Sequence, residues 1–152
     1  MSPLYFFLAI VWISYAFARM EIEIEGAHGW AENLPTHRLS PRHWVSVIFF
    51  EGRPVTEYHI WVELLILSLL HTIYVFLPFS VIIELQLLAF FCFMTVLEDF
   101  LWFVLNPAFG VQNFRAEKIW WHKDTWLWVA PRGYYTLLVL GAILYTASFY
   151  VR

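Results

Sequence analysis

The sequence contains little cysteine and little charge. Cys92 is the single cysteine, so no disulfide can form within the chain and no set of thiolates is available for a soft metal ion. Charged residues make up only 14% of the 152 residues, and the net charge is −3. This balance lacks the basic surface that a nucleic-acid-binding protein needs. No internal repeat or low-complexity tract is visible, which argues against a repeat protein.

Apolar residues dominate the chain: 61% are hydrophobic and 21% are aromatic. A transmembrane helix needs about 20 mainly apolar residues, and four segments approach that length, at 3–19, 58–77, 81–106 and 134–151. No basic residue precedes the first segment, so we expect a retained helix rather than a cleaved signal peptide. The sequence predicts an all-α membrane protein in which four transmembrane helices form an antiparallel bundle, as a single integral membrane domain over residues 1–152.

Four spans would place both termini on one side of the membrane and the connections 20–57 and 107–133 on the other. Of the nine Lys and Arg residues, all but Arg152 lie on the connection side. Basic residues accumulate in cytoplasmic loops. The sequence therefore predicts a multi-pass cell-membrane protein in contact with membrane lipid, with cytoplasmic connections and both termini outside. It does not indicate an oligomeric state.

The first connection has short patterns with a period of two. Residues 20–26 alternate apolar and acidic side chains before Gly26, which favours an extended strand. Residues 43–50 also resemble a strand, and after a turn at 51–54 the segment 55–58 can return as its partner. We expect a small extramembrane β-hairpin or sheet.

Two adjacent carboxylates, Glu98 and Asp99, lie inside the third apolar segment. A charge at membrane depth costs about 3 kcal/mol or more and usually faces a bundle interior or a water-filled cavity. Glu98 precedes Asn106 by eight residues, or about 12 Å of helix. Asp99 follows about 100° around the helix axis, so the two side chains cannot face the same point equally well.

Other ionisable residues fall at the same end of the predicted bundle. His59 and Glu63 are four apart and share a helix face, and the glutamates of segment 20–26 begin where the first span ends. The topology predicts that these groups converge on one cytoplasmic pocket. The candidate catalytic residues are Glu98, Asp99 and Glu63, and the candidate metal ligands are His59, Glu63, Glu98, His122, Asp124, Glu23 and Glu25.

Carboxylates and imidazoles are ligands for Zn, Mn, Fe or Mg, so the sequence predicts a divalent metal as the cofactor. The site would be cation-binding and could serve an enzyme that acts on a lipid or isoprenoid by acid–base or metal-assisted chemistry. The alternative is a non-enzymatic packing, partner or ion-transport protein. Its acidic groups would then be structural ion pairs, with Arg53, Arg115 or Lys118 as partners.

Two strings carry a resemblance to known proteins. The segments 22–26, 29–31 and 34–36, together with 98–107, resemble a family of small uncharacterised prokaryotic four-span membrane proteins, which implies the fold and no activity. Residues 97–103 are similar to the paired-acid aromatic motif of small membrane lycopene cyclases, which protonate a polyene with a carboxylic acid. Val96 stands where that motif usually has proline, and the similarity does not extend to a carotenoid substrate.

Overall fold

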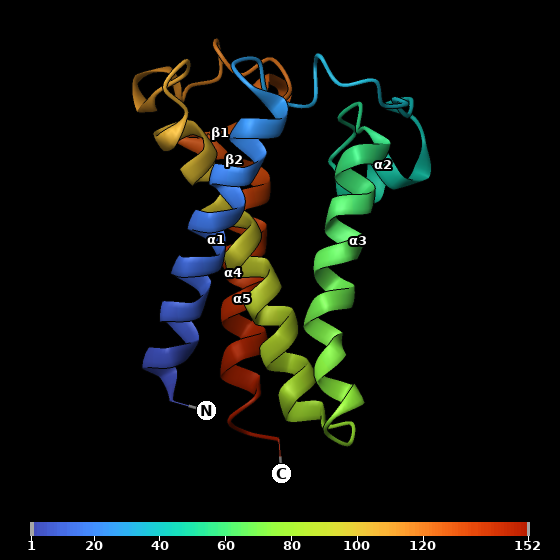
Figure 1. Ribbon diagram of the computed structural model, residues 1–152, viewed down its shortest axis with the longest axis vertical. Coiled ribbons are helices and arrows are strands. Elements are labelled where there is room, and N and C mark those ends of the chain that lie inside the picture. Colours follow the sequence, from blue (N-terminus) through green and yellow to red (C-terminus); the bar gives the residue numbers. More distant parts are fainter. Residues whose placement is uncertain (1, 152) are drawn as a thin grey trace.

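The computed structural model describes residues 2–151 and is mainly helical (Figure 1). The four longest helical elements are α1 (Pro3–Glu25), α3 (Glu57–His71, continued by the 3-10 helix η1, Thr72–Val75), α4 (Val81–Leu105) and α5 (Arg132–Ala147). Three stretches are long and apolar enough to cross a membrane: α1, α3 with η1, and α4. The predicted apolar spans are confirmed for these three.

The fourth predicted span, 134–151, is shorter in the structure. α5 ends at Ala147, and 16 residues of helix extend about 24 Å, against a bilayer hydrocarbon core of about 30 Å. Turn residues follow it. The structure therefore provides three membrane-length helices and one shorter helix, and a four-span bundle is not confirmed.

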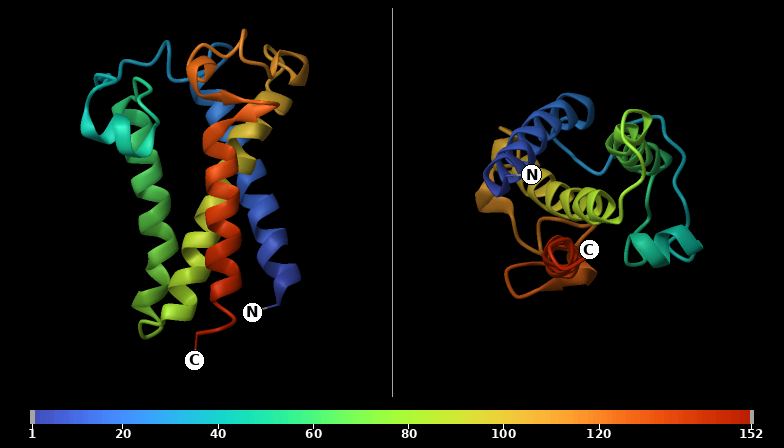
Figure 2. Two further views of the ribbon diagram at one scale, coloured as in Figure 1. Left: turned by 180° about the vertical axis from the view of Figure 1, so that it is seen from behind. Right: turned by 90° about the horizontal axis from the view of Figure 1, so that it is seen from below.

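α4 lies at the centre of the arrangement, with α1 and α5 packed along it (Figure 2). α3 contacts α4 much less, and none of its residues is buried by the rest of the described chain, residues 2–151. The described ends of the chain lie at one end of the bundle, whereas the two long connections lie together at the other. This arrangement brings residues from both connections over the same end of α4.

Small residues allow α1 and α4 to approach closely. Ser14 and Ala18 on α1 are fully buried, and the Ser14 hydroxyl donates a hydrogen bond to the Met94 carbonyl at 3.2 Å. At the connection end, the Asn106 side-chain amide donates to the Gly26 carbonyl at 2.9 Å. These bonds fix the register of the two helices and the place where α1 ends.

The predicted strand at 20–26 is wrong, because α1 continues as a helix through Glu25. In a helix, Glu21 and Glu25 are four residues apart and lie on one face, while Glu23 points away. Glu21 and Glu25 are buried, whereas Glu23 is exposed and lies 3.7 Å from Arg19. Helix extension thus separates the glutamates into an inner pair and a surface residue.

The predicted hairpin at 43–58 is also wrong. Residues Trp44–Phe49 form the short helix α2, capped by the His43 side chain, which accepts a bond from the Val45 N–H. The following segment makes only an isolated bridge, between Arg38 and Thr56, within the described residues. A small antiparallel sheet does exist, but it lies in the second connection, where β1 (Trp126–Leu127) pairs with β2 (Ala130–Pro131). Two 3-10 helices precede it, η2 (Val111–Asn113) and η3 (Lys123–Thr125).

Candidate functional site

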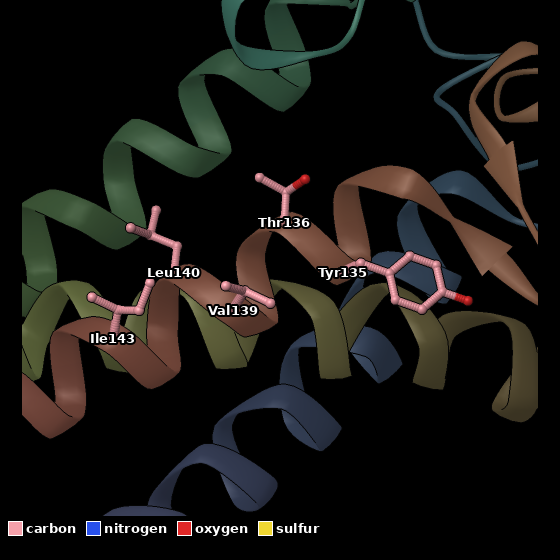
Figure 3. Close-up of a pocket in the computed structure, with 5 residues that line it drawn as sticks. All are labelled: Tyr135, Thr136, Val139, Leu140 and Ile143. Atoms are coloured by element: carbon pink, nitrogen blue, oxygen red, sulfur yellow. The ribbon is translucent and has the colours of Figure 1, made fainter.

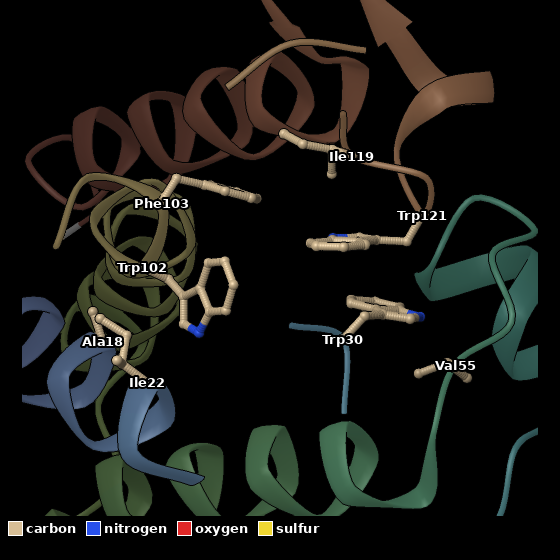
Figure 4. Close-up of a cluster of buried hydrophobic side chains, with 8 residues drawn as sticks. All are labelled: Ala18, Ile22, Trp30, Val55, Trp102, Phe103, Ile119 and Trp121. Atoms are coloured by element: carbon tan, nitrogen blue, oxygen red, sulfur yellow. The ribbon is translucent and has the colours of Figure 1, made fainter. Parts of the chain in front are cut away.

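A cluster of aromatic side chains covers the connection end of the bundle (Figure 4). The indole rings of Trp30 and Trp121 stack with centroids 6.2 Å apart and an interplanar angle of 9°. Trp102 on α4 meets Trp121 edge to face, and all three rings are buried. One tryptophan comes from α4 and one from each connection, so their packing holds both connections over the end of α4.

A left-handed turn places Trp30 in this cluster. Gly29, Trp30 and Ala31 have φ values of +67°, +49° and +50°, a conformation that costs a residue with a side chain about 1–2 kcal/mol. The turn directs the Ala31 N–H onto Glu25, whose Oε1 accepts it at 2.7 Å. The strained backbone is therefore tied directly to a buried carboxylate at the end of α1.

Glu25 also faces His59 of α3. The Glu25 Oε1 atom lies 3.3 Å from His59 Nε2, and the Thr56 hydroxyl lies 2.6 Å from the other ring nitrogen. The imidazole stacks against Trp30 with centroids 4.2 Å apart. His59 is thus engaged at both nitrogens and on one ring face, an arrangement that fixes the ring.

One turn earlier on α1, Glu21 accepts a hydrogen bond from the Tyr58 hydroxyl at 3.2 Å. Tyr58 and His59 are neighbours at the start of α3. These two contacts join the inner face of α1 to the start of α3, which otherwise packs little against the bundle. The beginning of α3 is consequently held to the bundle by polar groups.

Asp99 joins groups from three other segments. Its carboxylate accepts a hydrogen bond from the Tyr134 hydroxyl of α5 and lies 3.7 Å from His122 Nε2. The Arg53 guanidinium donates to the His122 ring at 3.2 Å, and it lies over the Trp30 ring at 4.8 Å. Asp99 therefore sits at the junction of both connections, α4 and α5.

The environment of His122 and Arg53 shifts the pKa of each group. Burial lowers the pKa of His122 below its ordinary value of 6.5; the contact with Asp99 opposes this effect, and the charge of Arg53 adds to it. Burial likewise lowers the pKa of Arg53, while Asp99 and Glu51 act to raise it. A neutral His122 accepts the bond from Arg53 on one nitrogen and directs the other toward Asp99.

Glu98 and Glu63 differ from these bonded groups. The Glu98 Oε1 and Glu63 Oε2 atoms are buried and have no hydrogen-bond partner among the described residues. Glu98 is 7% exposed, and the charges that act on it are all carboxylates. We call the five acids that act on one another here the acidic cluster, which consists of Glu21, Glu25, Glu63, Glu98 and Asp99.

The predicted site residues fall into two groups. Glu63, Glu98, Asp99, Glu25, His59 and His122 come together at this end of the bundle, as the topology predicted. Glu23 and Asp124 lie outside it and are exposed. The expected contact between a glutamate of segment 20–26 and this site is confirmed by the Glu25–His59 pair, although a helix rather than a strand delivers it.

Residues 2–151 contain no group of three His, Cys, Asp or Glu side chains already arranged around one point at ligand distance. The buried oxygens of Glu98 and Glu63 nevertheless lack partners, and unpaired carboxylate oxygens are the donors that a hard cation prefers. The donor set therefore fits a divalent ion in its chemistry, and coordination would require these side chains to rotate toward one another.

Several members of the site were not predicted from the sequence. Trp30, Tyr58 and Tyr134 contact acidic-cluster residues or the histidines paired with them, and Arg53 was expected only as one of several ion-pair partners. The glycine before Trp30 was a usable signal, since a glycine commonly marks a left-handed turn. Tyr134 begins an apolar run and carried no signal of its own.

Comparisons with protein-family models, curated proteins and solved structures find no match to this chain.

Proposed function

We propose that this chain is an integral membrane protein whose acidic cluster binds a divalent cation. Its helices, α5 included, cross the membrane four times, and the connections lie in the cytoplasm with the termini outside. Large apolar side chains remain exposed along α1, α3 and α5, which suits contact with lipid. The eight basic residues on the connection side support the orientation.

The unpaired Glu98 carboxylate is the observation that carries the cation proposal. Leaving a buried carboxyl group without a hydrogen-bond partner costs about 1–3 kcal/mol, and more when the group is charged; the groups that act on Glu98 are carboxylates as well. Arg53 acts on Asp99 and is already hydrogen-bonded to His122. A bound divalent ion would neutralise the excess charge and give the free oxygens of Glu98 and Glu63 a partner.

Oxygen ligands favour Mg²⁺ or Mn²⁺ over softer metals. We assign Glu63 and Glu98 as the ligands, because their buried oxygens lack partners, whereas Glu21, Glu25 and Asp99 already accept hydrogen bonds. His59 and His122 orient carboxylates rather than bind the ion. Outer groups of this kind commonly hold metal ligands in place.

Manganese binding to purified protein tests the proposal. The chelator-treated protein in detergent is titrated with Mn²⁺ and free ion is followed by electron paramagnetic resonance. Wild type should bind Mn²⁺, and Glu98→Gln should weaken binding at least about tenfold, by the scale known for groups that support a metal site. Glu23→Gln is the matched control, since it removes the same charge from an exposed position on α1.

Two results would contradict the proposal. One is a wild-type protein that binds no Mn²⁺ while its helical circular dichroism is intact. The other is an equal loss of affinity in Glu98→Gln and Glu23→Gln, which would indicate diffuse attraction to surface charge.

A further inference from the structure

An apolar groove runs along α4 and α5 and ends beside the acidic cluster. Its volume is about 550 Å³, and its lining is apolar except for one hydroxyl-bearing residue, Tyr134. Phe93, Leu97 and Phe100 line it from α4, and Leu138 lines it from α5. Phe93 precedes the end of α4 by 12 residues, or about 18 Å of helix, so this end of the groove lies at the depth of the hydrocarbon core. The other end is lined from the second connection by Val111, Phe114, Val129 and Ala130.

Tyr134 separates the groove from the polar site. Its ring lines the groove and stacks on Phe114 with centroids 6.1 Å apart. Its hydroxyl donates to Asp99, which lies 3.7 Å from His122. A chain lying in the groove would therefore end against Tyr134, the residue that both lines the groove and bonds to Asp99.

The other hollow on α5 lacks this connection (Figure 3). It is lined by residues of that single helix, including Thr136, Val139 and Leu140. Their side chains project from one face of α5, and the hydroxyls on that face, of Tyr135 and Thr136, donate to the Leu127 and Arg132 carbonyls rather than to the acidic cluster. It serves as an internal comparison, because it offers apolar surface on the same helix without a link to the acidic cluster.

We infer that the groove between α4 and α5 binds the hydrocarbon chain of a bilayer-dissolved long-chain alcohol, with its hydroxyl at Tyr134 and Asp99. The inference rests on the proposed function, since the cation site supplies the polar end. Asp99 lies among four further acidic side chains of the cluster, and Arg53 is the cation that acts on it. An anionic phosphate or carboxylate head would be repelled there, whereas a neutral hydroxyl can donate to a carboxylate and accept from a tyrosine.

Photolabelling tests this inference in bilayers of phosphatidylcholine. Diazirine-labelled hexadecanol is crosslinked to the protein and the labelled peptides are mapped, with unlabelled hexadecanol, palmitate or hexadecane as competitors. We expect labels on groove residues of α4 and α5, displaced best by hexadecanol. Equal displacement by all three competitors would overturn the inference.

Substitutions at adjacent positions locate the binding surface. Leu138→Trp fills the groove and should reduce labelling of α4 several-fold, whereas Val139→Trp, on the neighbouring face of α5 that lines the other hollow, should leave it unchanged. Tyr134→Phe keeps the ring and should reduce the preference for hexadecanol over hexadecane about three- to tenfold, the value of one hydrogen bond. Equal labelling of the two tryptophan variants would refute the assignment.

Manganese titration of the same variants separates this inference from the cation proposal. Leu138→Trp should retain Mn²⁺ binding while losing the alcohol. If the wild type binds Mn²⁺ but its labelling shows no preference for the alcohol, the groove inference is wrong and the cation proposal stands. If the labelling is specific for the alcohol but no Mn²⁺ binds, the cation proposal is wrong and the groove inference stands.

Discussion

Replacing Gly29 with alanine should destabilise the protein, because the added methyl group would collide with the buried rings of Trp102 and Trp121. A Cβ atom at this position would lie 2.7 Å from a ring carbon of Trp102 and 2.9 Å from one of Trp121. Both rings are almost fully buried, at 3% and 5% exposed, so neither can swing aside into solvent. The φ of +67° adds a backbone cost.

The two costs can be estimated separately. The left-handed conformation costs alanine about 1–2 kcal/mol, and forcing a methyl group into a packed core costs about 1–3 kcal/mol. Gly29→Ala should therefore lower the free energy of unfolding by about 2–5 kcal/mol. Gly52 has a similar φ of +78°, but its nearest neighbour, the Pro41 carbonyl oxygen, is 4.0 Å away. Gly52→Ala should accordingly lose only the backbone part, about 1–2 kcal/mol.

Denaturant titration in a mild detergent, followed by tryptophan fluorescence and circular dichroism, measures both losses. The difference between the two variants isolates the contact with the indole rings, because the backbone cost is shared. If Gly29→Ala and Gly52→Ala lose the same free energy of unfolding, the ring contact contributes nothing and the packing argument fails.

Two further predictions concern the topology and the buried glutamate of α1. With Cys92 replaced by alanine, single cysteines at Ser2 and Tyr150 should react with an impermeant thiol reagent from outside the cell, and one at Lys123 only from inside. Reaction at Ser2 and Tyr150 from opposite sides would show that α5 does not cross. Glu25→Ala should lower the free energy of unfolding by about 1–3 kcal/mol, because it leaves the Ala31 N–H without its acceptor. Glu23→Ala should change the free energy of unfolding by no more than about 0.5 kcal/mol. Equal losses in the two variants would refute the assignment of Glu25 as the inner, bonded glutamate and Glu23 as a surface residue.

The order and direction of the long helices, and the end of the bundle at which the connections lie, were predictable from hydropathy alone. The apolar lengths identified three membrane-length helices, and their succession placed both connections at one end of the bundle. From this it followed that Glu98 of α4, Glu63 of α3 and the glutamates after residue 20 would meet. Such predictions depend only on helix length and direction, which are robust to errors in local structure.

Local structure in the first connection was not predictable in the same way. The alternation at 20–26 fits a strand, but the same residues as a helix bury Glu21 and Glu25 against α3 and α4 and expose Glu23. The deciding contacts are tertiary ones: Tyr58 binds Glu21, and His59 meets Glu25. Because both partners come from α3, nothing within the segment itself could indicate them.

The short helix α2 shows the same limitation. Its residues Trp44, Val47, Ile48 and Phe49 are β-branched or aromatic and therefore typical of strands, yet they form one exposed helical turn and a half. The His43 side chain caps this helix, and no neighbouring strand is available within residues 2–151 to pair with it. Pairing partners, rather than propensity, decided the outcome.

The site contains two kinds of acidic residue, and the difference between them favours a functional reading. Glu25 and Asp99 have their contacts supplied by the protein, namely the Ala31 N–H and His59 for one, and Tyr134 and His122 for the other. If the cluster served packing alone, the same would be expected of every member, because a buried polar atom without a partner costs about 1–3 kcal/mol, and more when the group is charged.

Glu98 and Glu63 depart from that expectation while lying beside residues that meet it. The fold supplies hydrogen-bond partners to Glu25 and Asp99 and leaves oxygens of Glu98 and Glu63 without them. This arrangement is unfavourable, and packing does not require it. Natural proteins break such rules chiefly at functional sites. If the proposed cation completes the bonds of Glu98 and Glu63, it would remove this cost, and its binding would then stabilise the fold.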